Sequence, residues 1–238
     1  MNKLKICLTP ALLPLFRLSG CVVVVVDVLR ATSSFVVGLD EGRLTKILPL
    51  MDLETCLSKR QLGYLVAAER DGAVVEGFDF GNSPFSYQQA HLAGRDLAVT
   101  TTNGTKTIHL SASADEIVVG CLLNLSAVVA YLAGRGKDVV VACAGWKDHF
   151  NLEDTLCAGA LVWHLQQSGG FEFANDECLV ASMVYGQAIR EGLFNFVKKS
   201  AHFARLAAFG IEADIRFCMQ ENYSAVVPVY RDGFLVKA

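Results

Sequence analysis

The chain has 238 residues, enough for one large domain or two small ones. Hydrophobic residues make up 53% of it and charged residues 19%, which indicates an extensive core. The formal net charge is -3 and no basic block stands out, which argues against a nucleic-acid partner and requires local groups to hold any anionic ligand.

The sequence also argues against a membrane partner. Pro10, Pro14 and Arg17 interrupt the apolar segment near the N-terminus, so this segment does not resemble a signal peptide. The longest uncharged segment, residues 117–134, is better explained as a strand followed by a helix than as a membrane-spanning helix. The eight cysteines show no CxxC and no zinc spacing, and most lie in apolar runs, so we expect reduced thiols and a cytoplasmic protein.

Five consecutive valines at residues 22–26 predict a short strand buried on both faces, as in a parallel sheet with helices above and below. Asp27 ends the run, and Arg30, Thr32 and Ser33 follow before a helical pattern begins. Open α/β sheets bind ligands at the carboxyl ends of their strands. A carboxylate, a guanidinium and hydroxyls at this point suit a phosphate and a metal, although a turn closed by an Asp27–Arg30 pair explains them equally well.

The apolar pattern along the rest of the chain predicts alternating strands and helices. The chain opens with a strand followed by a loop or short helix. Further strands are expected at residues 47–49, 64–68, 97–100, 117–119, 139–142, 213–218, 226–230 and 234–236. Helices are expected at residues 32–40, 52–62, 87–93, 106–111, 183–193 and 198–210, and after residues 125 and 151. No Pro- or Ser-rich linker divides the chain, so we expect a single compact domain over residues 1–238.

The segment TTTNGT, residues 100–105, follows one of these strands. The Gly104 amide would lie at the start of a helix, where exposed N–H groups beside threonine hydroxyls form an anion cradle. An ordinary Asn-Gly turn with threonine caps is the alternative. The number of threonines favours the anion site.

A weak internal similarity links this segment to the first. Aligning Asp27 with Thr100 places Ala31 opposite Gly104, and both units run strand, polar loop, helix and strand. They are either a duplication that gives two intertwined similar lobes or two generic αβ units.

Two acids, Glu153 and Asp154, follow a strand-end CAG loop and fall in the first turn of a helix that Asp148 or Asn151 would cap. Acids in a first turn are commonly partners of the helix dipole. They also lie where a magnesium site could form, because Mg²⁺ takes a few carboxylates and keeps several waters.

Polar residues thus follow several predicted strands, including Glu69 and Arg70 after one and Asn82 and Ser83 in the turn-rich GFDFGNSP. Gathered at one edge of a sheet, they suit a phosphate ester bound with Mg²⁺. The sequence has no Walker A motif, no GxGxxG after a strand and no GxSxG. The sequence therefore lacks the signatures expected of nucleotide kinases, nicotinamide oxidoreductases and serine hydrolases.

An ordered series of motifs resembles the 2-phosphosulfolactate phosphatase family. The series consists of DVLRATSS, ER at 69–70, GFDFGNSP, TTTNGT, VGCLLN at 119–124, CAG followed by LED, and SAHFARLAAFGIEADIRFC, and it spans residues 22–228. The resemblance implies an α/β fold with a mixed, largely parallel sheet layered between helices (three layers, α/β/α). It also implies Mg²⁺-dependent hydrolysis of phosphate monoesters of 2-hydroxy acids, in the family's best-known case a step towards coenzyme M. Residues 146–150 fill the CAG–LED loop unusually, which bears on the substrate more than on the reaction.

On this basis we expect Asp27, with Glu153 or Asp154, to hold Mg²⁺, and Glu69 is a further candidate ligand. Asp27, Arg30 and Arg70 are the expected catalytic residues, the two arginines holding phosphoryl oxygens. The expected phosphate- and substrate-binding residues are Thr32, Ser33, Asn82, Ser83, Thr101, Thr102, Asn103, Gly104, Thr105 and His202.

The substrate carboxylate needs a second anion site, for which Asn82–Ser83 and His202 are candidates. His202 and Arg205 together could contact an anion, although a capped surface helix explains both equally well.

The sequence leaves several alternatives open. Asp27 could be a nucleophile that forms an aspartyl phosphate, or the metal could activate water for direct attack. A non-catalytic phospho-acid binding protein and a phosphotransferase with the same site are the rival functions. Retention of Asp27 and both acids of the LED motif argues against a pure binder. An apolar helix face around Leu161 could support a homodimer, although core packing explains it as well.

Overall fold

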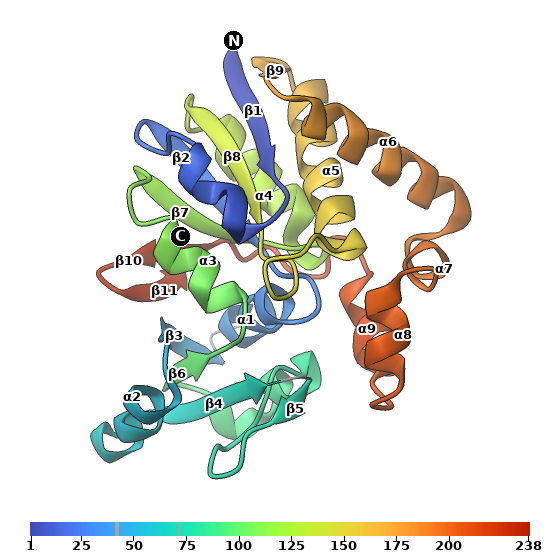
Figure 1. Cartoon of the computed structure of the whole chain (residues 1–238). Coiled ribbons are helices and arrows are strands. Elements are labelled where there is room, and N and C mark those ends of the chain that lie inside the picture. The colour runs from blue at the N-terminus through green and yellow to red at the C-terminus, as the bar shows by residue number, and fades with distance from the viewer. Residues whose placement is uncertain (41–42, 71) are drawn as a thin grey trace.

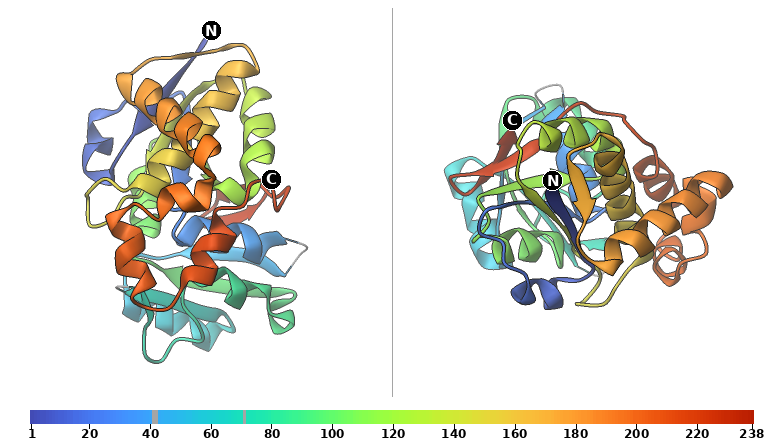
Figure 2. Two further views of the ribbon diagram at one scale, coloured as in Figure 1. Left: turned by 90° about the vertical axis from the view of Figure 1, so that its right-hand side faces the viewer. Right: turned by 90° about the horizontal axis from the view of Figure 1, so that it is seen from above.

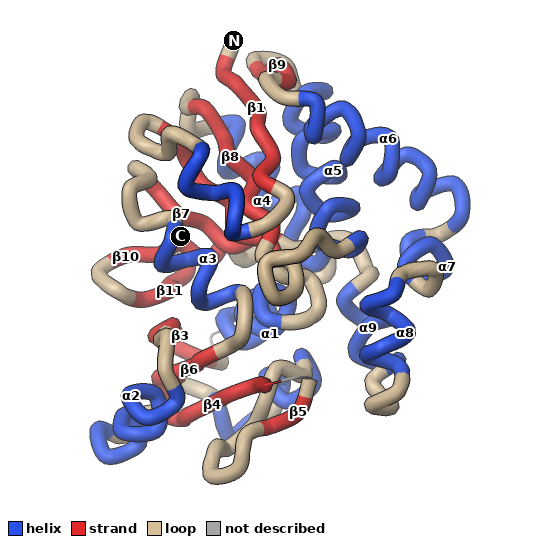
Figure 3. The backbone as a smooth tube through the Cα atoms, viewed as in Figure 1, coloured by secondary structure: helices blue, strands red, loops and turns tan. Residues whose placement is uncertain are grey.

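The computed structural model describes residues 1–40, 43–70 and 72–238 (Figure 1). In these ranges eleven strands form one mixed sheet with helices against both faces (Figure 3). The strands are β1 (Asn2–Cys7), β2 (Cys21–Val26), β3 (Leu44–Pro49), β4 (Leu65–Arg70), β5 (Ala73–Val74), β6 (Arg95–Thr100), β7 (Glu116–Gly120), β8 (Asp138–Cys143), β9 (Phe171–Phe173), β10 (Pro228–Arg231) and β11 (Phe234–Lys237). The predicted α/β class with a mixed, largely parallel sheet is confirmed.

The helices are α1 (Ala31–Leu39), α2 (Leu53–Ser58), α3 (Gly104–Leu110), α4 (Leu125–Ala133), α5 (Leu152–Gln167), α6 (Asp176–Glu191), α7 (Leu193–Val197), α8 (Ala201–Ala207) and α9 (Glu212–Cys218). Short 3-10 segments are η1 (Pro10–Leu15), η3 (Lys59–Leu62), η4 (Pro84–Gln88), η5 (Ala90–Leu92) and η6 (Leu122–Asn124).

The five-valine strand β2 lies in the middle of the sheet and is buried on both faces, as predicted. Val22, Val24 and Val26 pack into the core that α4, α5 and α6 cover. Val23 and Val25 pack into the opposite core, with α1 and η1. β2 pairs in parallel with β7 on one side and with β8 on the other, so it has no edge exposed to solvent.

The sheet consists of two parallel groups separated by an antiparallel hairpin, and the short strand β5 pairs antiparallel with β4 at one edge. Strands β7, β2, β8, β1 and β9 form one group, and β4, β6 and β3 form the other. The hairpin β10–β11 lies between them and pairs antiparallel with β7 and with β3. Figure 1 shows the two groups inclined to each other across this hairpin. Strand ends from both groups therefore reach one region of the molecule.

The internal similarity has a structural counterpart. The unit β2–α1–β3 starts in the first group and ends in the second, and β6–α3–β7 makes the reverse passage. The aligned residues Ala31 and Gly104 are the first residues of α1 and α3. A Cβ built on Gly104 would lie 2.9 Å from the Cβ of Ala31, so the two helix starts touch.

Helices α7, α8 and α9, residues 193–218, form an arm beside the sheet, on the same side of the molecule as α6 (Figure 2). Phe203, Leu206 and Ile215 attach the arm to the core that α5 covers. The strand predicted at residues 213–218 is wrong, because this segment is helix α9. Its apolar residues Ile215 and Cys218 recur at helical spacing, and Glu212 and Asp214 occupy a first turn, where acids favour a helix.

The helix predicted at residues 87–93 is also wrong. The chain there forms the 3-10 segments η4 and η5, which are separated by Gln89 in extended conformation. Pro84 opens η4, and its ring fits a helix start without extending the helix further.

Two expectations from composition can be compared with this fold. The eight cysteines are all buried free thiols. None of the helices in the described ranges combines the length and the apolar character needed to cross a membrane.

Helices α5 and α6 cross at a glycine, which gives a test of the packing. A Cβ on Gly159 would lie 2.0 Å from the backbone oxygen of Ala181, far closer than any normal contact. We expect Gly159→Ala to lower the free energy of unfolding by roughly 1–3 kcal/mol, measured by urea denaturation followed by circular dichroism.

Gly186 in α6 is the matched control, because a Cβ there would meet nothing within 4 Å. Gly186→Ala should leave stability unchanged or raise it by up to about 1 kcal/mol. Equal stability of the two variants would contradict the close crossing.

Candidate active site

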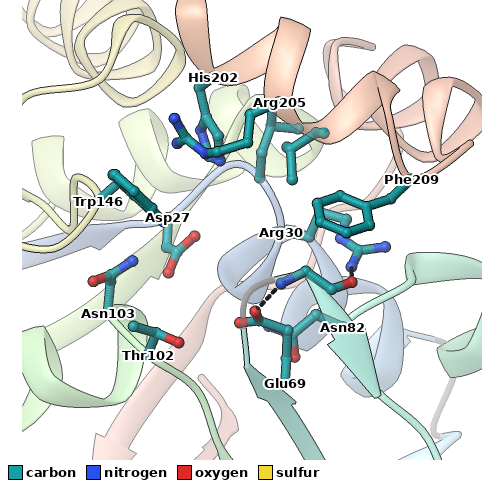
Figure 4. Close-up of a pocket in the computed structure, with 13 residues that line it drawn as sticks. Asp27, Arg30, Glu69, Asn82, Thr102, Asn103, Trp146, His202, Arg205 and Phe209 are labelled. Atoms are coloured by element: carbon teal, nitrogen blue, oxygen red, sulfur yellow. Dashed lines mark hydrogen bonds between the residues drawn. The ribbon is translucent and has the colours of Figure 1, made fainter. Parts of the chain in front are cut away.

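A cavity of about 110 Å³ lies where the loops after β2 and β6 meet the end of β4 and helix α8 (Figure 4). Residues from five separate segments line it. They are Asp27, Leu29 and Arg30; Glu69, Gly72 and Asn82; Thr102 and Asn103; Trp146; and His202, Arg205, Leu206 and Phe209. Of the residues predicted from sequence, the structure brings Asp27, Arg30, Glu69, Asn82, Thr102, Asn103 and His202 together in this lining.

Asp27 is held by the loop that connects β2 to α1. Its backbone N–H donates to the Thr32 hydroxyl at 3.0 Å, and its carbonyl accepts from the Thr32 N–H at 2.9 Å. Ser33 donates to the Val28 carbonyl at 2.8 Å. Thr32 and Ser33, predicted as phosphate ligands, are buried and serve here to fix the loop.

The Asp27 carboxyl group lies in a negative environment. Burial and the neighbouring charge of Glu69 together raise its pKa to about 7, and the charge of Glu153 makes a smaller contribution in the same direction. His202 and the backbone hydrogen bond from Ala31 act in the opposite direction. A cation bound beside Asp27 would offset both the burial and the repulsion.

Glu69 faces Asp27 across the pocket, near the carboxyl end of β4 (Figure 4). Its carboxylate accepts from the Gly72 N–H at 2.5 Å, and no ion pair to it is found among the described residues. Gly72 has φ of +87°, which a glycine adopts without strain. The same glycine's carbonyl accepts from Arg30 at 3.0 Å, so Gly72 links the two charged side chains.

Arg30 is buried against a carboxylate from the arm. Its guanidinium forms an ion pair with Asp214 of α9, and both side chains are less than a tenth exposed. Ser83 donates to the other oxygen of Asp214 at 3.1 Å. The structure thus places Ser83 behind Arg30 rather than in the pocket, and Asp214 fixes the direction of the guanidinium.

The loop after β6 forms a closed set of threonine hydrogen bonds. The Thr105 N–H donates to the Thr101 hydroxyl at 3.1 Å, and the Thr105 hydroxyl donates to the Thr101 carbonyl at 2.9 Å. These two residues therefore shape the loop. The buried Thr102 hydroxyl has no hydrogen-bond partner among the described residues, and Thr102 lines the cavity. A Cβ on Gly104 would lie 2.9 Å from Asp27 Oδ2, so only glycine lets this loop approach Asp27 so closely.

His202 contacts the first acid of the LED motif. Its Nδ1 pairs with the Glu153 carboxylate, which is completely buried. In the part of the chain that the structure describes, the second oxygen of Glu153 has no hydrogen-bond partner. Helix α8, capped by Ser200, presents His202 to the pocket. Glu153 thus lies behind His202 and does not line the cavity.

Asp154 connects two loops instead of lining the site. One carboxylate oxygen accepts from the Val28 N–H at 2.8 Å and the other from the Gly145 N–H at 3.0 Å. Burial and the charges of Asp27 and Glu153 raise the pKa of Asp154, while these two backbone donors lower it.

Arg70, the other predicted catalytic residue, is not among the residues that line the cavity. Its guanidinium donates to the Thr100 hydroxyl at 3.1 Å and to the Glu69 carbonyl at 2.7 Å. It joins the ends of β4 and β6 and thereby positions Glu69.

The four carboxylates named as candidate Mg²⁺ ligands take different positions in the structure. In residues 1–40, 43–70 and 72–238, no three or more His, Cys, Asp or Glu side chains form a group that could hold a metal ion. Asp27 and Glu69 are the carboxylates that line the cavity, beside the unpartnered oxygens of Asn82 and Thr102. One or two carboxylates with other oxygen donors suit Mg²⁺, which keeps several waters and binds substrate phosphate directly.

Sequence reasoning missed Trp146, Leu206 and Phe209 in the lining, whereas it named Arg205 as a possible contact for an anion. Trp146 and Arg205 stack on each other, with the guanidinium carbon 3.8 Å from the ring centroid. Leu206 and Phe209 complete the same wall. The unusual filling of the CAG–LED loop pointed to Trp146, whereas Asp214 was hidden by the mistaken strand at residues 213–218.

Comparisons with known proteins agree with one another. The sequence model of a family described as 2-phosphosulpholactate phosphatase matches residues 7–233. A protein of Thermotoga petrophila named probable 2-phosphosulfolactate phosphatase is 38% identical over 213 residues, covering 90% of each chain. A protein of the same name from Caldanaerobacter subterraneus subsp. tengcongensis is 36% identical, covering 90% of this chain and 89% of that one.

A third relative with that name, from Picosynechococcus sp., is 34% identical over 241 residues and covers 99% of this chain and 98% of its own. The similarity therefore includes the β2 loop, the threonine loop and the arm, which together build the cavity. This chain belongs to the 2-phosphosulfolactate phosphatase family, a family of phosphoric monoester hydrolases.

Proposed function

We propose that this protein is a Mg²⁺-dependent phosphatase that hydrolyses phosphate monoesters of 2-hydroxy carboxylic acids. The proposed substrate is 2-phosphosulfolactate, converted to sulfolactate and phosphate. The names of its relatives support this substrate class, and the eight free thiols support the cytoplasm as its compartment.

One observation carries the proposal: two carboxylates that form no ion pair with any described residue line one small cavity together with cationic and hydroxyl groups. Asp27 and Glu69 face each other across the cavity, and Thr102, Asn103, Arg30 and Arg205 also line it (Figure 4). A cavity for a multiply charged phosphate ester needs positive charge near the phosphoryl group. The carboxylates of Asp27 and Glu69 would repel the negatively charged phosphoryl group unless a cation lay between them and that group.

The charge pairing of the cavity supports Mg²⁺ as that cation. Arg30 is already neutralised by Asp214, and His202 is paired with Glu153. Asp27 and Glu69, with the oxygens of Asn82 and Thr102, are the groups that would hold the ion. When bound, Mg²⁺ would neutralise charge on the phosphoryl oxygens and so favour displacement at phosphorus.

The protein's own groups have separate tasks in this scheme. Arg30 directs a fixed guanidinium at the phosphoryl oxygens, and the Asn103–Gly104 backbone at the start of α3 offers N–H groups to them. Water supplies the oxygen that replaces the ester oxygen, and the alcohol takes a proton on leaving. His202, held by Glu153, is the group in the lining suited to move that proton.

Asp27 has two chemical routes open to it. In the first its carboxylate attacks phosphorus, forms an aspartyl phosphate and releases the alcohol, and water then hydrolyses the acyl phosphate. In the second Asp27 stays unmodified and water attacks directly. The approach of Gly104 to within Cβ contact of Asp27 Oδ2 would fix the carboxylate in either route.

The test of the proposal is phosphate release from a panel of esters with Mg²⁺ and with a chelator. The panel is 2-phosphosulfolactate, 2-phospholactate, phosphoglycolate and p-nitrophenyl phosphate. We expect Mg²⁺-dependent release confined to the 2-hydroxy acids, with 2-phosphosulfolactate fastest. Release that survives complete removal of divalent ions would contradict the Mg²⁺ proposal. A folded protein that binds these esters without releasing phosphate would instead support a binding protein.

Asp27→Asn should lower kcat at least about a thousandfold, because the amide neither attacks phosphorus nor binds Mg²⁺ well. Single-turnover phosphate release is the measurement, and unchanged circular dichroism establishes that the variant is folded. Asp96→Asn, in an exposed ion pair with Lys46, is the control and should retain normal activity. Near-normal turnover by Asp27→Asn would remove Asp27 from the mechanism.

Gly104→Ala tests the contact between the two loops. The added methyl group would displace the Asp27 carboxylate, so we expect kcat/KM to fall about tenfold or more while the helix start itself remains favourable. Steady-state kinetics on the best ester of the panel measure this. Gly186→Ala again serves as control, and wild-type kinetics for Gly104→Ala would refute the close contact.

A further inference from the structure

Arg205 differs from the other cations of the cavity because no carboxylate neutralises it. Arg30 is paired with Asp214 and His202 with Glu153, but no ion pair to Arg205 is found in the described part of the chain. Its guanidinium lies over the ring of Trp146, 3.8 Å from the centroid. Figure 4 shows Arg205 reaching from α8 into the cavity with His202 beside it.

Stacking on an indole fixes a guanidinium without using its N–H groups. The ring face attracts the cation and restricts its rotamers, while the donors along its edge stay free for an anion. Leu206 and Phe209 form the neighbouring wall, and these apolar side chains strengthen electrostatic attraction by excluding water. Arg205 is therefore a preorganised and unneutralised anion site.

The candidates expected to bind the substrate's second acid group are less suited to it. Ser83 donates to Asp214, and Nδ1 of His202 is committed to Glu153. Asn82 is a neutral amide, so it supplies no positive charge to an acid group. The substrate class proposed above carries at least one acid group besides the phosphoryl group, and that group needs a positive partner.

We propose that Arg205, held on Trp146, binds an acid group of the substrate other than its phosphoryl group and so determines specificity. This rests on the proposed function and adds the residue that distinguishes a phosphorylated acid from a simple phosphate ester. The acid group is a carboxylate or a sulfonate, both of which accept from the edge of a guanidinium.

The first experiment measures binding by isothermal titration calorimetry, with sulfolactate and inorganic phosphate as probes. Arg205→Gln should weaken sulfolactate binding about 10- to 100-fold and leave phosphate binding unchanged. Arg205→Lys should recover part of the loss. Equal weakening of both probes, loss for phosphate alone, or no change for either would overturn the proposal, as would a wild-type protein that binds phosphate but no sulfolactate.

Arg216 provides a matched control. It stacks on Phe194 at 3.9 Å in the same manner, but it is largely exposed and does not line the cavity. Arg216→Gln should leave both affinities unchanged. An equal loss in both variants would indicate a general effect of stacked arginines on the arm.

A second experiment identifies the acid group. The esters are 2-phosphosulfolactate, 2-phospholactate with a carboxylate only, 2-phosphoethanesulfonate with a sulfonate only, and ethyl phosphate with neither. Arg205→Gln should raise KM for the esters that carry the recognised group and leave the kcat/KM of ethyl phosphate at its wild-type value. If ethyl phosphate is turned over too slowly, its competitive inhibition constant replaces the rate. A uniform fall across all four would place Arg205 on the phosphoryl group and refute the proposal.

Fluorescence gives a readout that a structural role alone would not change. The chain has two tryptophans, and Trp163 does not line the cavity. In a Trp163→Phe background, sulfolactate should alter the emission of Trp146 as the guanidinium above it engages the anion, and Arg205→Gln should abolish this response. Wild-type turnover of the ester panel remains a separate result, so failure of the proposed function and failure of this inference are distinguishable.

Discussion

The active site depends on the carboxylate of Asp154, which holds the loops after β2 and β8 in a fixed relation. It accepts from the Val28 N–H on one loop and from the Gly145 N–H on the other. Because the carboxylate is buried, few other groups compete for its oxygens. Its two oxygens accept from backbone N–H groups that would otherwise lack hydrogen-bond partners. Asp27 and Trp146, each next to a tethered residue, therefore face the same cavity.

The charged side chains around the cavity divide into paired and unpaired groups. Buried charges are costly unless they are paired, and the structure pairs Arg30 with Asp214 and His202 with Glu153. Among the residues that the structure describes, Asp27, Glu69 and Arg205 form no such pair, and all three line the cavity. Groups whose charges are unbalanced in the free protein are those that a metal ion and an anionic substrate would balance. The proposed metal site and the proposed specificity thus rest on the same electrostatic arrangement of the cavity.

The helical arm of residues 193–218 supplies one wall of the cavity. It brings His202, Arg205 and Asp214 to strand ends that precede it by more than a hundred residues. Its attachment is apolar, through Phe203, Leu206 and Ile215 in the core shared with α5. The specificity proposed for Arg205 thus rests on hydrophobic packing as well as on charge.

The sequence by itself determined the strand-and-loop units of this protein. The valine run had to be buried on both faces, and Asp27 had to lie at its end, because a charge cannot continue a core strand. Such local constraints, with the ordered motifs, were enough to predict the α/β class, the family and much of the cavity lining.

Only the tertiary structure decided which polar residues face the ligand. Glu153 and Asp154 are adjacent in sequence to a strand end, yet one supports His202 and the other joins two loops. Arg70 likewise bonds to Thr100, while Arg205, more than a hundred residues away, lines the cavity. Local pattern specifies that a polar side chain follows a strand, but its direction depends on which distant donor or acceptor the packed fold brings within reach.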